Sequence, residues 1–151
     1  MNGLIALAVC MVAAGFEGLC AGRDPMAQLK ALRQPRWSPP NWLWVLIGLA
    51  WYGLCYAALV RLLPFWKTDP APVLFLGLLL MANGAANLFQ FRLRRLDLAF
   101  LFLPPYWVLL AAFLWRTGRL DPLTAWLFVP YSLYQLYAAV WAYALWRMNR
   151  R

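Results

Sequence analysis

The sequence predicts an all-α membrane protein, a bundle of five transmembrane helices that forms a single domain over residues 1–151. Hydrophobic residues make up 65% of the chain and charged residues only 13%, whereas a soluble domain carries about 25% charged residues. Five apolar runs also approach the ~20 residues that a helix needs to cross the bilayer. So little charge cannot cover a water-facing surface, which excludes a soluble enzyme.

The predicted helices are joined by three tight turns and one long loop. They cover about residues 3–21, 42–63, 73–91, 98–115 and 123–146. The first is expected to stay as a membrane helix, because no basic residue precedes Arg23 as it would in a signal peptide. Pro104-Pro105 and Pro130 lie inside the last two helices and predict kinks. The loop 22–41 is basic and Pro-rich, and a lone long loop in a compact bundle often acts as a lid.

Charge predicts the orientation. One side of the predicted bundle carries ten basic residues, and the other carries Arg61, Lys67, Arg116 and Arg119. The ten are Arg23, Lys30, Arg33, Arg36, Arg92, Arg94, Arg95, Arg147, Arg150 and Arg151. The positive-inside rule places them in the cytoplasm, with the N-terminus outside and the C-terminus inside. We therefore attribute the net charge of +9 to topology and anionic lipid headgroups, and expect no nucleic-acid partner.

No catalytic or metal site is predicted. The chain has no His, which is the commonest general base and metal ligand. Cys10, Cys20 and Cys55 are isolated in apolar runs, which favours small buried side chains over disulfides or metal ligands. No nucleophile motif, phosphate loop or useful carboxylate pair is present, so an enzyme is not favoured.

Polar side chains inside the predicted helices are the candidates for a site. Asn83, Asn87 and Gln90 share one face of the third helix, and such groups usually face the bundle interior. Their spacing is equally compatible with contacts to a ligand and with interhelical hydrogen bonds of ~1 kcal/mol each. Glu17 is expected at the membrane interface, because the first helix ends by Gly22.

Aromatic residues are abundant, with 10 Trp, 7 Tyr and 9 Phe. Trp51 and Tyr52 lie on the second helix, and Tyr131 and Tyr134 form a stripe with Ala138 on the fifth. Packing is the commoner role of such stripes, and a ligand site requires that they converge with the third helix. On that third helix, Gly77, Gly84 and Ala85 allow close approach and predict a homodimer.

The run from Leu32 to Trp42 reads LRQPRWSPPNW and resembles the Pro-x-Trp-x-Pro-Pro-x-Trp motif of the TspO/MBR family. These are tryptophan-rich sensory proteins related to the mitochondrial translocator protein, or peripheral benzodiazepine receptor. In that family, as here, the motif joins a long first loop to the second helix. The resemblance covers about residues 30–149, with further matches at Tyr52, Asn83, Val129-Pro130-Tyr131 and Trp146–Asn149. Departures mark a divergent member: family Trp positions are Gly48, Ala86 and Tyr134 here, and a family Asn is Ala142.

The resemblance implies a five-helix protein of the bacterial inner membrane, often dimeric, that binds a tetrapyrrole or sterol-like ligand beneath its first loop. No cofactor is required, although a bound porphyrin or heme fits this class. A porphyrin disc would stack on Trp and Tyr, and Arg33 and Arg36 would pair with its carboxylates. The ligand-binding residues that the resemblance implies are Trp37, Pro39, Pro40, Trp42, Trp51, Tyr52, Asn83, Asn87, Tyr134 and Ala138.

Three functions follow from these observations. The first is binding of a tetrapyrrole or another flat lipophilic ligand, with a regulatory or transport role. The second is a structural or assembly subunit of a larger membrane complex, which a filled space between the second, third and fifth helices would favour. The third is an enzyme that degrades porphyrin photochemically through Trp radicals, which Gly48 and Tyr134 make less favourable.

Overall fold

The computed structural model describes residues 1–150, and within that part every regular element is helical. The elements are α1 (Asn2–Ala21), α2 (Pro25–Ala31), α3 (Asn41–Leu62), the 3-10 turn η1 (Leu63–Phe65), α4 (Ala71–Asn87), the π-helical segment η2 (Leu88–Arg92), α5 (Leu96–Leu101), α6 (Leu103–Leu120), α7 (Pro122–Leu127) and α8 (Val129–Asn149). The predicted all-α class is therefore confirmed.

Four helical stretches are long and apolar enough to cross a membrane. They are Asn2–Ala21, Asn41–Phe65, Ala71–Arg92 and Leu96–Leu120. Helix α8 has 21 residues but is not among these four. Its Ser132 and Gln135, together with several Tyr side chains, make it more polar than the others. The fifth span therefore remains a prediction.

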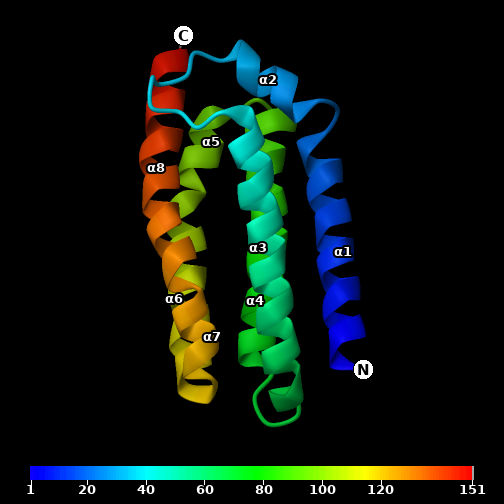
Figure 1. Ribbon diagram of the computed structural model, residues 1–151. Coiled ribbons are helices and arrows are strands. Elements are labelled where there is room, and N and C mark those ends of the chain that lie inside the picture. Colours follow the sequence, from blue (N-terminus) through cyan, green and yellow to red (C-terminus); the bar gives the residue numbers. More distant parts are fainter. Residues whose placement is uncertain (151) are drawn as a thin grey trace.

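The long helices lie side by side, with the N-terminus and the C-terminus at opposite ends of the bundle (Figure 1). Helix α4 is central, because α1 and α6 both pack against it, and α1 also contacts α3. Helix α5 packs on α8. The short helix α2 lies across the end of the bundle at which α8 finishes (Figure 1), so it covers any cavity that opens at that end.

The proline-containing helices are interrupted where the sequence predicts kinks. Helices α5 and α6 separate at Phe102, just before Pro104-Pro105, and α7 and α8 separate at Phe128, just before Pro130. A proline has no N–H to continue the helical ladder. The hydrogen-bond ladder of α8 starts at the backbone oxygen of Phe128, which accepts from the amide of Ser132 at 2.9 Å and from its hydroxyl at 3.0 Å.

The predicted lid loop 22–41 contains a helix that the sequence analysis did not predict. The Asp24 side chain caps α2 by accepting a hydrogen bond from the Ala27 amide at 2.9 Å, and Pro25 occupies the first turn. Leu29 is 2% exposed and forms a small buried cluster with Trp141 and Leu145 of α8. The segment is thus an anchored cover and not an open loop.

Helix α1 approaches α4 closely at Gly84. This glycine is buried, and a Cβ placed on it would lie 2.6 Å from the Phe16 ring. Gly84 therefore serves a contact within the chain, contrary to the dimer role that the sequence suggested for it. A Cβ at Gly77 would meet nothing within 4 Å, so the α4 surface that remains for a second copy is that of Gly77 and Ala85.

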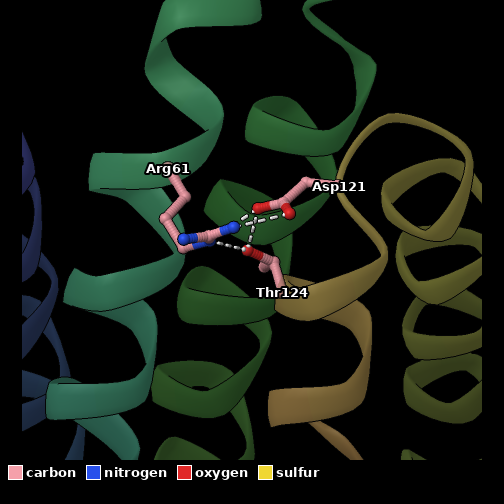
Figure 2. A network of polar contacts seen from close by, with 3 residues as sticks. All are labelled: Arg61, Asp121 and Thr124. Atoms are coloured by element: carbon pink, nitrogen blue, oxygen red, sulfur yellow. Dashed lines mark hydrogen bonds and ion pairs between the residues drawn. The ribbon is translucent and has the colours of Figure 1, made fainter.

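Ion pairs tie the elements together at the end of the bundle away from α2. Arg61 of α3 binds both carboxylate oxygens of Asp121 at 2.7 Å, and its Nε also donates to the Thr124 hydroxyl at 3.0 Å (Figure 2). The Arg61 guanidinium and the Thr124 hydroxyl hold the pKa of Asp121 below its usual range. Arg116 pairs with Asp69 at 2.6 Å. Two of the four basic residues at this end are therefore neutralised.

Candidate ligand-binding site

Glu17 is the centre of a polar network between three helices. Its Oε2 accepts hydrogen bonds from the Tyr52 hydroxyl of α3 at 2.6 Å and from the Asn83 amide of α4 at 2.8 Å. Its Oε1 accepts one from the Asn87 amide at 2.8 Å. The carboxylate of Glu17 therefore points into the bundle, although the sequence favoured the membrane interface over an intramembrane position for this residue.

Asn83 and Asn87 reach the same carboxylate because they lie one helical turn apart on α4. Their amide nitrogens therefore supply the interhelical hydrogen bonds that were one of the two interpretations of this pair. Their amide oxygens accept no hydrogen bond from any other residue in the described part of the chain. Those oxygens remain available to a ligand.

The carboxylate of Glu17 opens on a cavity of about 210 Å³. Helices α3, α4 and α8 and the segment η2 form its other walls, so the aromatic and amide stripes of the sequence converge here. Its lining residues are Glu17, Trp44, Ile47, Gly48, Trp51, Asn83, Ala86, Asn87, Gln90, Tyr131, Tyr134, Gln135 and Ala138. We call this space the Glu17 cavity.

One wall of the Glu17 cavity is a fixed aromatic surface. Trp51 stacks on Tyr131 with ring centroids 4.3 Å apart and planes inclined by 23°. The Tyr131 hydroxyl is hydrogen-bonded to Tyr106 and Gln135. Each ring is thus held in place by a neighbour, which gives a flat ligand a preorganised surface for stacking.

The structure brings together about half of the residues proposed for the site. Trp51, Asn83, Asn87, Tyr134 and Ala138 line the Glu17 cavity, and Tyr52 reaches it through its hydrogen bond to Glu17. The other residues lie elsewhere: Trp37, Pro39, Pro40 and Trp42 do not line this cavity.

The two tryptophans of the loop motif have other surroundings. The Trp37 ring packs edge-on against Tyr137 of α8, with centroids 5.6 Å apart, and its backbone oxygen accepts a hydrogen bond from the Tyr137 hydroxyl at 3.3 Å. Trp42 is 62% exposed at the start of α3. Trp37 thus fastens the loop to α8, whereas Trp42 faces outward.

The three positions at which this chain departs from the family's tryptophans all lie on the cavity wall. Gly48, Ala86 and Tyr134 line it, and each is smaller than the indole that it replaces. These departures therefore affect the size and chemistry of the cavity itself.

A second cavity of about 430 Å³ lies beneath α2 and shares Gln90 with the Glu17 cavity. Arg94 lines it, at a left-handed backbone position with φ 53° that follows η2. Arg33 lines a separate space beside Asn149, and Arg36 is exposed on the loop. Arg94 is therefore the basic residue that lines the space adjoining the Glu17 cavity, and the resemblance did not indicate it.

The loop that covers this end is fastened to α8. The Trp141 indole donates to the Ser38 hydroxyl at 2.9 Å, and that hydroxyl donates to Gln34 at 2.7 Å. Asn149 exchanges two hydrogen bonds with the backbone of Arg33, at 3.0 and 2.9 Å. These contacts hold the loop over the end of the bundle where the two cavities lie.

Glu17, Gln90 and Gln135 are polar residues of the cavity wall that are missing from the ligand-binding residues implied by the family resemblance. A lone acid in an apolar run was a usable signal for Glu17, because such residues usually face a bundle interior or a cavity. Gln90 and Gln135 had the correct periodicity with Asn83 and Tyr131. No group of side chains within residues 1–150 could hold a metal ion.

Comparison with known proteins agrees with this architecture. The model of the TspO/MBR family matches residues 6–147. Protein CrtK of Rhodobacter capsulatus is 28% identical over 138 residues, which cover 86% of each chain. Because the family match extends over nearly the whole length, this membrane protein belongs to the TspO/MBR family.

Proposed function

We propose that the protein binds a flat lipophilic ligand, of the tetrapyrrole type, in the Glu17 cavity and the adjoining space beneath α2, and that it has a regulatory or transport role. The observation that carries the proposal is the convergence of α1, α3, α4 and α8 on one space with aromatic and amide walls. The family supports the role, since its members are associated with such ligands.

The Glu17 cavity reaches the size of a typical ligand pocket only together with the adjoining space beneath α2. The Glu17 cavity alone, about 210 Å³, falls below the roughly 300–1,000 Å³ of typical ligand pockets. With the space of about 430 Å³ that shares Gln90, the site enters that range. A ring would lie against Trp51 and Tyr134, and an acidic edge would lie toward Arg94.

The competing functions have less support. An assembly subunit that had lost its ligand would be expected to fill the space between α3, α4 and α8, and here that space is open. Photochemical degradation through Trp radicals would rely on indoles at the cavity wall, and Gly48, Ala86 and Tyr134 replace three of them.

We further propose five spans, with the N-terminus outside and the C-terminus in the cytoplasm of a bacterial inner membrane, and a homodimer whose interface includes Gly77 and Ala85. The ten basic residues at one end and four at the other support this orientation, because the positive-inside rule counts Lys and Arg. The open space beside Gly77 permits a second helix to approach.

A titration of the purified protein with protoporphyrin and heme, followed by quenching of Trp fluorescence, tests the ligand proposal. Tyr134→Ala should weaken binding several-fold, because a stacked aromatic contributes ~1 kcal/mol beyond its area. Asn83→Ala should also weaken binding several-fold, because it removes a hydrogen-bonding amide from the cavity wall. Trp115→Ala is the control, since Trp115 is 63% exposed at the other end of the bundle beneath Arg119. No binding by the parent, or equal binding by all three variants, would contradict the proposal.

A further inference from the structure

The Glu17 cavity carries one charged side chain. Its lining residues include Glu17 and no Lys or Arg. Across residues 1–150, every ion pair lies elsewhere, at Arg61–Asp121, Arg95–Asp97 and Arg116–Asp69. Glu17 thus faces the cavity without a cationic partner from the described part of the chain.

The groups around Glu17 suit a carboxylate. Tyr52, Asn83 and Asn87 all donate, and both carboxylate oxygens accept. An ionised carboxylate has only acceptors and therefore fits this set of donors. Three neutral donors solvate the negative charge but do not cancel it, and an uncompensated charge within a membrane bundle is costly.

The walls beside Glu17 also favour a cation. Trp44, Trp51 and Tyr134 line the same cavity, and the faces of such rings attract ammonium groups and similar cations. Gly48 and Ala86 leave room near the carboxylate for the headgroup. Charge, aromatic faces and space therefore point to the same kind of group.

We propose that Glu17 makes the cavity selective for a lipophilic aromatic cation, an ammonium or amidinium on a ring system, and that it excludes carboxylates from this end of the site. This inference rests on the proposed ligand-binding function and names the chemistry of one end of that ligand. A larger ligand with an acidic edge binds only with that edge toward Arg94, in the space beneath α2.

Three naphthalene ligands with side chains of similar length but different charge test the proposal: naphthylethylammonium, propylnaphthalene and naphthylpropionate. Their affinities are measured by calorimetry on protein in nanodiscs of uncharged phosphatidylcholine, so that the lipid does not sort the ligands by charge. The parent should bind the cation about tenfold more tightly than the neutral ligand, a difference of ~1.4 kcal/mol, and the anion most weakly.

Glu17→Gln keeps the shape of the side chain and removes its charge, so it should abolish the preference for the cation while binding of the neutral ligand persists. Ala86→Lys retains Glu17 but supplies a competing cation from the wall, and should also abolish that preference. Asp97→Asn is the matched control, because Asp97 pairs with Arg95 outside the cavity, and it should leave the selectivity unchanged.

The outcomes separate this inference from the function on which it rests. Equal affinities for the three ligands, or an unchanged ratio in Glu17→Gln and Ala86→Lys, would overturn the selectivity while porphyrin binding still stood. Porphyrin binding without any naphthalene binding would also overturn the selectivity alone. Loss of both in the folded parent would overturn the ligand-binding function as well.

Discussion

At the scale of single residues, the absence of a side chain at Gly84 allows α1 to lie close to α4. A Cβ at this position would lie 2.6 Å from the Phe16 ring, so Gly84→Ala should cost about 1–3 kcal/mol, as overpacking does elsewhere. Within one copy of the chain, a Cβ at Gly77 on the same helix meets nothing within 4 Å, so in the monomer Gly77→Ala should be neutral or gain up to ~1 kcal/mol of helix propensity. Thermal unfolding in detergent compares the two.

A double-mutant cycle with Phe16→Ala shows whether the ring is the cause. If the clash is with Phe16, the loss from Gly84→Ala should largely disappear once the ring is removed, because the two substitutions then couple strongly. Equal melting temperatures for Gly84→Ala and Gly77→Ala would contradict the close packing of α1 on α4.

The site shows what residue patterns could and could not predict. Asn83 and Asn87 on one face of α4, with Trp51 and Tyr134 as aromatic partners, were predictable from spacing and from the family motif. Glu17 was placed at the interface, because a sequence does not reveal the rotation of α1 about its own axis. That rotation depends on packing between α1 and α4, whose contacting residues Glu17 and Asn83 are 66 residues apart in the chain.

At the scale of elements, the cover over the cavities depends on α8. Asn149 holds the backbone of Arg33 through two hydrogen bonds. Asn149→Ala should therefore accelerate amide hydrogen exchange several-fold within residues 32–40, since local opening then becomes cheaper. Arg150→Ala is the control, because the Arg150 guanidinium lies over the Trp146 ring. Equal protection in both variants would contradict a fastening role for Asn149.

The element boundaries were predictable to different degrees for physical reasons. The breaks at Phe102 and Phe128 follow from proline, whose missing N–H is visible in the sequence. Helix α2 also had a signal, the Asp24-Pro25 start, but its seven residues are too short for a periodic pattern. The π-helical turn at Leu88–Arg92 contains neither Pro nor Gly, so local sequence gives no indication of it.

The ion pair that joins α3 to α7 gives a pH dependence. Arg61 lowers the pKa of Asp121 in the folded protein, so the pair stabilises the fold fully above the usual aspartate value of ~3.9. That contribution is lost as the pH falls through the lowered pKa. Asp121→Asn should lower the free energy of unfolding by ~1–2 kcal/mol near neutral pH. The lower end of this range is expected, because the Arg61 side chain is 40% exposed and solvent screens the pair.

Denaturation measured between pH 6 and the acid limit distinguishes this pair from general acid unfolding. The parent should lose more stability on acidification than Asp121→Asn, because the variant no longer has the titrating partner of Arg61. Asp97→Asn serves as the comparison, since its pair with Arg95 is exposed and contributes little. Parallel curves for the parent and Asp121→Asn would contradict the assignment.

At the scale of the whole molecule, the distribution of charge predicts how the bundle is oriented. Among the described residues at the end that carries α2, Arg95 is the basic side chain with an acidic partner. At the opposite end, Arg61 and Arg116 are both paired. Anionic lipids of the cytoplasmic leaflet attract free cations, so the end with α2 should face the cytoplasm.

Labelling of single cysteines on intact cells with a membrane-impermeant maleimide tests this orientation. Thr68 and Lys30 are exposed at opposite ends of α3, and the three native cysteines are buried, so background reaction should be low. Thr68→Cys should react on intact cells, and Lys30→Cys only after the membrane is opened. The reverse pattern would contradict the orientation, and reaction of both from outside would contradict a membrane crossing by α3.

The same method tests whether α7 and α8 cross the membrane together. The polar face of α8 is turned inward, because Gln135 and Tyr131 contact each other and line the Glu17 cavity, while Leu133, Leu136 and Val140 are exposed and suit lipid. A helix shielded in this way can span despite its lower hydropathy.

Arg150→Cys should therefore be protected on intact cells like Lys30→Cys, because five crossings return the chain to the cytoplasm. If Arg150→Cys instead reacts from outside, like Thr68→Cys, the bundle has four spans, and α8 packs on the others without crossing.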